Sequence, residues 1–443
     1  MEPLQGIDNQ DLKVAELRNL QERGWAMLTE RRLLRLLIVL FALAGCKKPT
    51  EPDTEAPQVE VVYPVEGLDV FGVVEIRAVA KDTSGVDSVR FYVDDTPTPG
   101  GAVTRSPYLY PWDTRALAEG SSHTIRAKAW DKAGNSRDSD TVTVVVVSPL
   151  NYAVLSVHPT PLYASNLWVD GGFAYIADHG GGLQIVNISD PANPVQAASW
   201  DSLRSMWDIC IQDDYAYIAE EEEGIVVLDI SDPSNPFFAG GCESSHGGRA
   251  ISVSASRAYL AAVGSDLQIF DISDPHSITL TAEYGVGKQA YDLWVSGDLL
   301  FVVVGDSIGL KVLDVSGSFP RLIGELATPN ETKGIYVQGG YGYLADGGYG
   351  GLQVADLSDP REPRMIGSCA TFGYAYGCFV SGRYVYVADG SGGLFVADVI
   401  NPRYPSPIAH IDTYGFARGI FVGGDCAYIA DGNGGMAVVS WSR

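Results

Sequence analysis

The segment from Phe173 to Ser199, FAYIADHGGGLQIVNISDPANPVQAAS, carries the pattern that decides the fold, because it returns six more times in whole or in part. One aromatic residue, called here the repeat aromatic, marks the same place in every copy: Tyr175, Tyr217, Tyr259, Phe301, Tyr343, Tyr386 and Tyr428. Successive repeat aromatics are 42 residues apart, except for one interval of 43 residues. A constant period of about 40 to 45 residues is typical of stacked supersecondary units such as propeller blades.

Each repeat is predicted to contain four short strands. In the first repeat they cover residues 166–169, 174–178, 183–188 and 195–200, and glycine-rich turns join the first three. The tripeptide Ser189-Asp190-Pro191 separates the third strand from the fourth and returns in three later repeats. Proline cannot donate a hydrogen bond to a neighbouring strand, so it marks a strand end. The pattern predicts a seven-bladed β-propeller over residues 149–443.

The ring is expected to close through a strand from outside the repeats. The last repeat stops after its third strand, and the strand-like segment 151–158, NYAVLSVH, comes before the first repeat. We predict that this segment supplies the outer strand of the seventh blade, because closure leaves only short, protected strand edges.

The third strands of the repeats read LQIVNISDP, IVVLDISDP, LQIFDISDP, LKVLDVSGS, LQVADLSDP, LFVADVINP and MAVVSWS. In this motif the repeats resemble LVIVD-repeat proteins, over residues 163–443. The resemblance implies a β-propeller on the bacterial surface. It implies no reaction, because that family offers no catalytic motif to carry over to this chain.

Residues 57–148 form a separate unit of short strand-like runs. Ile125, Ala127 and Ala129 alternate with Arg126 and Lys128, the period-two pattern of a half-buried strand. The order DTSGVDSVRFYVDD, followed by YPWDTRALAEGSSHTIRAKAWDKAGN, resembles bacterial Ig-like domains, which implies a β-sandwich. The chain is therefore predicted to be all-β, with an Ig-like β-sandwich in front of the propeller.

Asp82, Asp87 and Asp131 of this unit are candidate calcium ligands, but they lack the dense alternating oxygen pattern of a calcium loop. Aspartate beside glycine is usual in turns, so we interpret them as turn residues. The six histidines lack metal-ligand spacing, and the cysteines form no C-x-x-C pair. The sequence therefore predicts neither a metal site nor a cofactor.

Residues 1–45 are interpreted as an upstream extension followed by a lipoprotein signal peptide. Within 27–46, MLTERRLLRLLIVLFALAGC, arginines precede an apolar run that is too short to span a bilayer as a stable helix. The end of this segment, Leu-Ala-Gly-Cys, resembles the lipobox of bacterial lipoproteins, which implies cleavage before Cys46 and its lipidation. An uncleaved signal anchor is the alternative. Because residues 1–26 have no signal character of their own, Met27 is a second candidate for the start.

These segments predict an exported protein that a lipid on Cys46 holds to the bacterial cell envelope, at the outer membrane or the cell surface. Residues 46–56 would be the lipidated cysteine and a proline-containing, semi-rigid linker. The Ig-like unit is then expected to hold the propeller away from the membrane. The formal net charge of −25 disfavours nucleic acid as a partner, because phosphates need clustered Lys and Arg.

One position of the repeats stands out as a candidate binding site. Ten residues before each repeat aromatic lie Ser165, Trp207, Arg249, Tyr291, Lys333, Tyr376 and Arg418. By the repeat these residues, called here the mouth ring, lie together where the first strand of each blade begins. Aromatic faces suit sugar rings and Arg suits carboxylates, so an acidic or neutral glycan or the acidic loop of a partner would match.

A structural interpretation of the same ring is cross-strand pairing. If the first hairpin turns on Gly171-Gly172, the ring faces the position three residues after the repeat aromatic: Asp178, Glu220, Ala262, Val304, Asp346, Asp389 and Asp431. Lys333 would then pair with Asp346, and Arg418 with Asp431, each pair contributing roughly 0.2 to 1 kcal/mol. Arg249 would face Ala262 without a partner, which makes it the first candidate for ligand binding.

The sequence favours a non-enzymatic envelope lipoprotein whose propeller is a binding or adhesion platform. Residues 305–309 match the G-x-S-x-G hydrolase motif, but they lie in a predicted hairpin loop and not in the strand-to-helix turn that the motif needs. One alternative is an enzyme acting on envelope polysaccharide, with Asp208 and Asp292 as paired carboxylates. Another is a structural scaffold of an envelope complex, with contacts on the sides of the propeller.

Overall fold

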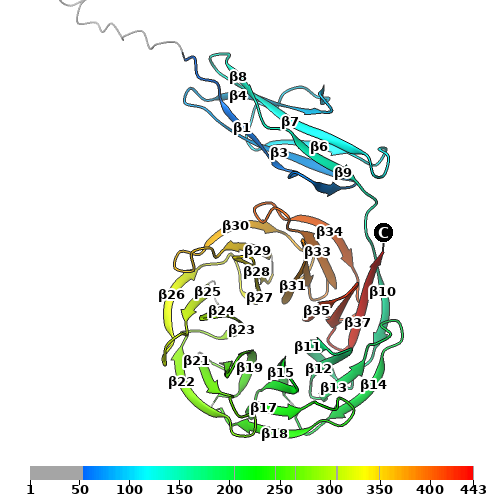
Figure 1. Ribbon diagram of the computed structural model, residues 1–443, viewed down its shortest axis with the longest axis vertical. Coiled ribbons are helices and arrows are strands. Elements are labelled where there is room, and N and C mark those ends of the chain that lie inside the picture. The colour runs from blue at the N-terminus through cyan, green and yellow to red at the C-terminus, as the bar shows by residue number, and fades with distance from the viewer. Residues whose placement is uncertain are drawn as a thin grey trace, which may run out of the picture.

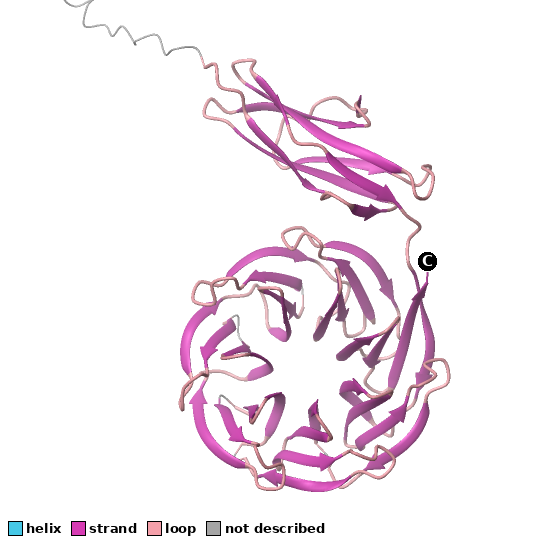
Figure 2. Cartoon of the chain, in the orientation of Figure 1, coloured by secondary structure: helices cyan, strands magenta, loops and turns pink. Residues whose placement is uncertain are grey.

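The computed structural model describes residues 53–442, except for residues 204, 245, 265, 306, 307 and 349. The predicted signal peptide, Cys46 and most of the linker lie outside these residues, as does the centre of the G-x-S-x-G motif. Two β-domains follow one another, and none of the described residues is helical (Figure 1 and Figure 2). In this part of the chain there is accordingly no helix with the length and apolarity that crossing a membrane requires.

The first domain is a sandwich of two sheets, as the sequence predicted. One sheet has the order β1–β3–β6, with β1 Gln58–Tyr63, β3 Val73–Lys81 and β6 Tyr108–Asp113. The other has the order β2–β9–β7–β4–β5, with β2 Leu68–Val70, β9 Val142–Val146, β7 Ser122–Asp131, β4 Val86–Val93 and β5 Thr96–Pro97, and β8 Ser136–Asp138 lies beside β7. Ile76, Phe91 and Ile125 meet between the sheets and are at most 1% exposed, so they form the core of the sandwich.

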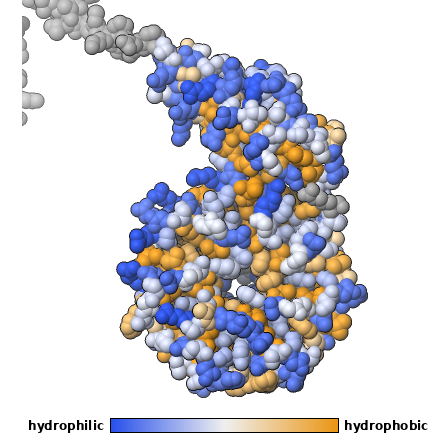
Figure 3. Space-filling model, viewed as in Figure 1, coloured by the Kyte–Doolittle hydropathy of each residue, from blue (hydrophilic) through white to orange (hydrophobic). Residues whose placement is uncertain are grey.

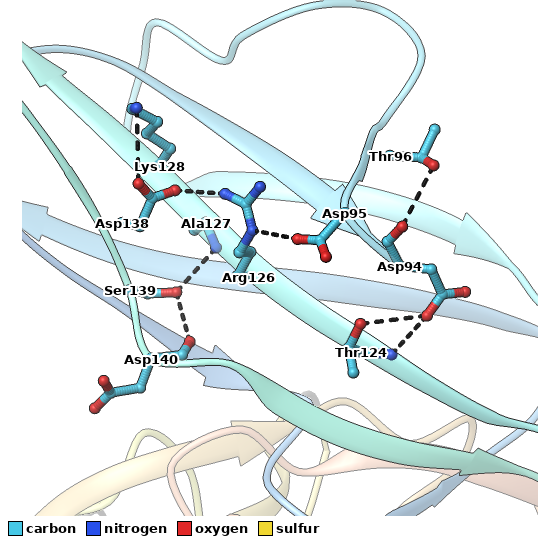
Figure 4. A network of polar contacts seen from close by, with 10 residues as sticks. All are labelled: Asp94, Asp95, Thr96, Thr124, Arg126, Ala127, Lys128, Asp138, Ser139 and Asp140. Atoms are coloured by element: carbon cyan, nitrogen blue, oxygen red, sulfur yellow. Dashed lines mark hydrogen bonds and ion pairs between the residues drawn. The ribbon is translucent and has the colours of Figure 1, made fainter.

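Strand β7 shows the predicted alternation between core and solvent. Ile125 and Ala127 are fully buried, whereas Arg126 and Lys128 lie on the outer face among acidic residues (Figure 4). The Arg126 guanidinium donates to Asp95 at 3.1 Å and also pairs with Asp138, and the Lys128 ammonium lies 3.7 Å from Asp138. Pairs of this kind at the surface contribute little to stability, so buried side chains hold the sandwich together.

The second domain contains seven four-stranded sheets among the described residues, arranged as blades around a central channel (Figure 1). Blade one comprises β11 Tyr163–Asp170, β12 Phe173–His179, β13 Gly182–Asn187 and β14 Val195–Trp200; blade two comprises β15 Met206–Gln212, β16 Tyr215–Glu220, β17 Gly224–Asp229 and β18 Phe237–Cys242. Blade three comprises β19 Gly248–Ser254, β20 Arg257–Ala262, β21 Asp266–Asp271 and β22 Thr279–Gly285; blade four comprises β23 Ala290–Ser296, β24 Leu299–Val304, β25 Gly309–Asp314 and β26 Arg321–Leu326. Blade five comprises β27 Thr332–Gln338, β28 Tyr341–Asp346, β29 Gly351–Asp356 and β30 Arg364–Cys369; blade six comprises β31 Gly377–Ser381, β32 Tyr384–Ala388, β33 Leu394–Asp398 and β34 Ser406–Ile411. The first strand of each blade, called here the inner strand, borders the channel.

The seventh blade joins the two ends of the domain. Its strands β35 Gly419–Gly423, β36 Cys426–Ala430 and β37 Met436–Ser442 are followed in the sheet by β10 Asn151–His158, which pairs antiparallel with β37. The segment 151–158 thus occupies the place that the sequence analysis assigned to it. The repeat aromatics lie between blades; Tyr259 of blade three, for example, packs with Leu293 and Leu300 of blade four.

The order of the strands gives the propeller two different faces. Each inner strand starts at one face, which we call the mouth face; it carries the loops that enter the inner strands and the loops between second and third strands. The opposite face carries the turns between first and second strands and the loops between third and fourth strands. The mouth ring belongs to the mouth face because it lies at the start of the inner strands.

The Ig-like domain contacts the opposite face at blade six. The Asn401 amide donates to the Val62 carbonyl oxygen at 2.7 Å, and the Arg383 guanidinium donates to the Asp69 carbonyl oxygen at 3.4 Å. The Arg77 guanidinium lies over the Tyr404 ring, 5.1 Å from its centroid. The two domains therefore touch (Figure 3). The propeller residues of these contacts, Arg383, Asn401 and Tyr404, all lie in loops of the opposite face and not of the mouth face.

Candidate functional site

The channel holds a cavity of about 440 Å³ that is lined by the inner strands of the blades. All seven members of the mouth ring, from Ser165 to Arg418, take part in this lining. The structure therefore brings together the residues that the repeat pattern had placed in one ring. Ser165 differs from the other six because it is neither aromatic nor cationic. Its hydroxyl hydrogen-bonds to the carbonyl oxygens of Ala177 and Met206.

The cross-strand pairing that we considered for the ring is wrong by one residue. In blade five, Thr332 lies opposite Asp346 and Gly334 opposite Ala345, so Lys333 is the extra residue of a β-bulge. Blades one to four have the same shift at the same place. In blade seven the paired stretch begins only at Gly419, after Arg418. A bulge residue is left out of the ladder, so the Lys333–Asp346 and Arg418–Asp431 pairs do not form.

The acidic residues expected to pair with the ring have another task. Asp178, Glu220, Asp346, Asp389 and Asp431, called here the latch carboxylates, are at most 2% exposed. They accept hydrogen bonds from the loops that enter the inner strands. Asp389 accepts from the Phe372 and Gly373 amides at 2.8 and 2.6 Å.

Burial makes the four aspartates among these groups reluctant to ionise. It raises the pKa of Asp178, Asp346 and Asp389, and it raises the pKa of Asp431 to about 6. One Asp431 oxygen accepts from the Thr413 hydroxyl at 2.7 Å, while the other is buried without a hydrogen-bond partner. The latch carboxylates therefore serve the fold of the mouth loops.

Two guanidinium groups of the mouth ring lie on aromatic faces. Arg249 lies over Trp207 and Tyr291, at 4.8 and 5.0 Å from the ring centroids. Arg418, from the far side of the ring, also approaches Trp207, at 5.3 Å, and lies 4.9 Å from Tyr376. Within the described part of the chain, neither guanidinium forms a salt bridge or a hydrogen bond through its side chain. Burial and then the charge of Arg418 lower the pKa of Arg249.

Lys333 differs from the two arginines because it has an acidic partner. Its ammonium lies 2.9 Å from Glu331 and 3.4 Å from the centroid of Tyr291. Glu331 also accepts from the Tyr291 and Tyr374 hydroxyls, at 2.6 and 3.1 Å. Burial tends to raise the pKa of Glu331, but these hydrogen bonds and Lys333 outweigh it and hold the pKa below its usual range. The sequence analysis missed Glu331 and Tyr374, which lie in loops outside the repeat pattern.

Glycines next to the ring allow neighbouring inner strands to approach closely. A Cβ atom at Gly334 would lie 2.5 Å from the Tyr376 carbonyl oxygen, and one at Gly377 would lie 2.6 Å from the Arg418 carbonyl oxygen. No real side chain tolerates such distances, so these positions need glycine. The close approach brings Lys333, Tyr376 and Arg418 together at the mouth.

Asp208 and Asp292 line the same cavity below the ring. The two Asp208 oxygens accept from the backbone amides of Ile209 and Ile251, each at 2.8 Å, and Asp292 bonds in the same way to Leu293 and Ile335. Each carboxylate thus ties its own inner strand to the next one. Burial raises the pKa of Asp208 to about 6, and burial together with Asp208 raises the pKa of Asp292 to about 8.

An aromatic belt lines the cavity farther down the inner strands. Successive centroids of Trp168, Phe421, Phe379, Tyr336 and Trp294 are 5.5, 4.8, 4.7 and 4.3 Å apart. Cys210 and Ser252 take the equivalent places in blades two and three. The cavity thus offers cations at its mouth and aromatic surface below, an arrangement that can hold an anionic group and a flat or apolar part of one ligand.

The Ig-like domain contains a group of three carboxylates. Oxygens of Asp53, Asp82 and Asp131 lie within 4.8 Å of one another, and no other such group of potential metal ligands occurs among the described residues. Asp82 and Asp131 do make the turn contacts expected of them, for example Asp82 with the Ser84 amide at 2.7 Å and Asp131 with the Asn135 amide at 2.8 Å. Asp87 is not part of the group. The cysteines Cys210, Cys242, Cys369, Cys378 and Cys426 are free thiols.

Comparisons with known proteins divide the chain in the same way. Residues 57–127 match the bacterial Ig domain. The LVIVD repeat matches seven times, at 163–202, 204–244, 247–286, 287–328, 330–371, 372–413 and 414–441. No curated protein matches the chain.

Two solved structures are similar in shape. The crystal structure of the WD40 β-propeller domain of Doa1 is 9% identical, with a TM-score of 0.53, over 66% of this chain and 97% of that chain. The designed protein Ika8 is 12% identical, with a TM-score of 0.49, over 73% of this chain and 94% of that chain. At such identity the first likeness supports the propeller fold alone.

Proposed function

This chain belongs to the family of LVIVD-repeat proteins, and from that premise we propose that it is a non-enzymatic binding protein of the bacterial cell envelope, which holds an anionic ligand at the mouth of its propeller. One observation carries the proposal. Arg249 and Arg418 reach the same cavity from different sides, lie on aromatic faces and form no salt bridge among the described residues.

An anion would improve the electrostatics of this mouth. Partly buried cations without a salt-bridge partner are costly, and burial and the charge of Arg418 lower the pKa of Arg249 although Glu221 and Glu331 act in the opposite direction. A carboxylate between the two guanidinium groups would accept short, charge-assisted hydrogen bonds and remove their mutual repulsion. Stacking on Trp207 and Tyr291 holds Arg249 in place beforehand, which lowers the entropy lost on binding.

The position of the Ig-like domain supports a role as a platform. It contacts blade six on the face opposite to the mouth. If the signal at residues 27–46 exports the chain and Cys46 is lipidated, the Ig-like domain stands between the membrane and the propeller. The mouth face then remains open to a ligand from outside.

The enzyme and scaffold alternatives have less support. All four oxygens of Asp208 and Asp292 already accept backbone amides of the channel wall, so a structural task accounts for both residues. A scaffold that uses only the sides of the propeller gives no reason for two cations without partners at the mouth.

The test is a titration of the full chain in detergent with citrate, glucuronate and an oligoglutamate peptide, followed by calorimetry at low ionic strength. We expect saturable, salt-sensitive binding of at least one carboxylate, and its loss in the Arg249→Gln, Arg418→Gln double variant. The matched control is Arg361→Gln, Arg364→Gln, which removes two exposed cations from the opposite face. Equal binding by both double variants, or no saturable binding at all, would contradict the proposal.

A further inference from the structure

One arc of the mouth face exposes large apolar side chains. Phe372 of blade six, Tyr414 of blade seven and Leu162 of blade one are 73%, 81% and 55% exposed. We call these three residues the apolar arc. They lie in the loops that enter the inner strands of three neighbouring blades. The Phe372 ring packs on His410 of the outer strand β34, with ring centroids 4.6 Å apart. In blade two, by contrast, Leu203 of the corresponding loop is buried.

The loops of the apolar arc are held in fixed conformations. Latch carboxylates accept the amides of Leu162, at 2.9 Å, and of Phe372, at 2.8 Å. Asp431 holds the loop of Tyr414 through the Thr413 hydroxyl. The fold thus presents these apolar side chains to solvent on fixed loops, and preorganised surfaces of this kind lose less entropy on binding.

Tyr414 has a strained backbone as well. Its φ is 67°, in the left-handed region that bulky residues rarely adopt, and its amide donates to Asp412 at 2.8 Å. Strain of this kind costs on the order of 1–3 kcal/mol and is concentrated at functional sites. A tyrosine held outward at this cost, with most of its surface exposed, indicates a contact with another molecule.

The blade next to the apolar arc, blade two, carries acidic residues on the mouth face. Glu221, Glu222 and Glu223 are exposed in the loop between β16 and β17 of blade two. The latch carboxylate Glu220 accepts the amides of Glu222 and Glu223 at 2.6 and 2.7 Å, so this loop is also fixed. The Glu221 carboxylate accepts from the Trp207 indole at 2.7 Å. The mouth face therefore presents apolar surface on blades six, seven and one and acidic surface on the neighbouring blade two, with Arg249 and Arg418 at the channel.

We propose that the occupant of the mouth is a loop of a partner protein. Its carboxylate enters between Arg249 and Arg418, its apolar side chains cover the apolar arc, and a basic side chain meets Glu222 and Glu223 of the neighbouring blade two. This inference rests on the proposed function and names the ligand. Protein interfaces are rich in Trp, Tyr and Arg at their centre, as this mouth is. A glycan could stack a sugar ring on Phe372, but the aliphatic Leu162 offers it no aromatic face.

The experiment selects ligands from a phage-displayed library of random peptides on the full chain in detergent. We expect the enriched peptides to contain one acidic residue with apolar residues on one side. Their affinity should fall about tenfold or more in the Phe372→Ser, Tyr414→Ser double variant and in Arg249→Gln. Phe319→Ser is the matched control, because Phe319 is 75% exposed in a loop of the opposite face. It should leave the affinity unchanged.

Citrate binding measured on the same samples separates the two proposals. The apolar-arc variant should keep citrate binding, since it retains both arginines. If citrate binds and no acidic peptide is enriched, or if the apolar-arc variant keeps full peptide affinity, the polypeptide inference is overturned and the proposed function stands. An acidic polysaccharide whose binding depends on Phe372 and Tyr414 would also overturn it. If neither citrate nor a peptide binds, the proposed function itself fails.

Discussion

The latch carboxylates and the mouth cations are both repeated charged positions of one propeller, and their surroundings are opposite. Asp389 is buried and accepts three hydrogen bonds from the loop that enters the inner strand of its blade. Arg249 lies at the cavity on two aromatic faces and has no salt bridge. A charge that the fold itself satisfies serves the fold, whereas a charge held in place and left unsatisfied is available for another molecule.

The two blades without a latch carboxylate support this distinction. Ala262 of blade three and Val304 of blade four take that position, and Gln289 of the loop that enters blade four contacts both blades there. Gln289 accepts the Gly264 amide at 2.9 Å, and the Gly305 amide donates to the Gln289 carbonyl oxygen at 3.0 Å. In blade three the Gln289 side chain thus acts where the acid is absent, whereas the Gly305 contact has a counterpart in blade two, where the Glu221 amide donates to the Ser205 carbonyl oxygen at 3.0 Å. No comparable replacement neutralises Arg249 or Arg418 among the described residues.

The largest expected effect is on stability, from removing a latch. Asp389→Ala would leave the Phe372 and Gly373 amides and the Thr371 hydroxyl without their acceptor, at a cost of about 3 kcal/mol. Urea unfolding followed by tryptophan fluorescence measures the loss. Asp389→Asn keeps an acceptor oxygen and should lose less, and Arg249→Gln should lose nothing. A midpoint for Asp389→Ala equal to that of the unaltered protein would show that the latch does not hold the loop.

The next effect is a pH dependence. The pKa of Asp431 is raised to about 6, so between about pH 4 and 6 the folded state keeps a proton that the unfolded state has released. The stability contributed by Asp431 is therefore greatest at low pH and declines as the pH rises through this window. Asp431→Asn imitates the protonated group and removes the decline.

Unfolding midpoints of the two proteins at several pH values check this prediction. The stability of the variant relative to the unaltered protein should increase by on the order of 1 kcal/mol from pH 4 to 7. Taking the difference cancels the other titrating carboxylates, several of which have lowered pKa values, such as Asp94. A constant difference would show that Asp431 ionises as easily in the folded state as in the unfolded chain.

The sequence was sufficient to predict both domains and the membership of the mouth ring. A constant period places equivalent residues at equivalent points of a closed ring, so Trp207, Arg249 and Arg418 could be grouped without knowing any contact. Alternation of apolar and polar residues likewise predicted β7. These inferences depend only on spacing, which a regular fold preserves.

The partners of the ring could not be predicted in the same way. The bulge at Lys333 adds one residue to the inner strand, and residue spacing alone fits the regular and the bulged register equally well. That one residue changes the neighbour of Asp346 from Lys333 to Thr332. Glu331 was missed because it lies in a loop, where repeats differ in sequence and conformation. The contact of Asn401 with Val62 uses a backbone oxygen, which leaves no mark in the sequence.

The smallest expected effect concerns Lys333, the one mouth cation that resembles the latches in having a partner. Glu331→Gln keeps one acceptor oxygen for the Tyr291 hydroxyl, places an amide group that donates beside the Tyr374 hydroxyl, and removes the charge that offsets Lys333. Lys333 then becomes a third cation available to the ligand. We expect citrate to bind about fivefold more tightly, which corresponds to about 1 kcal/mol, with a steeper dependence on salt. Calorimetry at two ionic strengths measures both quantities. The control is Glu325→Gln, a substitution on the outer strand of blade four that removes the acidic partner of Lys311. Unchanged or weaker citrate binding by Glu331→Gln would mean that the mouth does not attract anions through its net charge, and that Glu331 is needed to hold Tyr291 and Tyr374 where the ligand meets them.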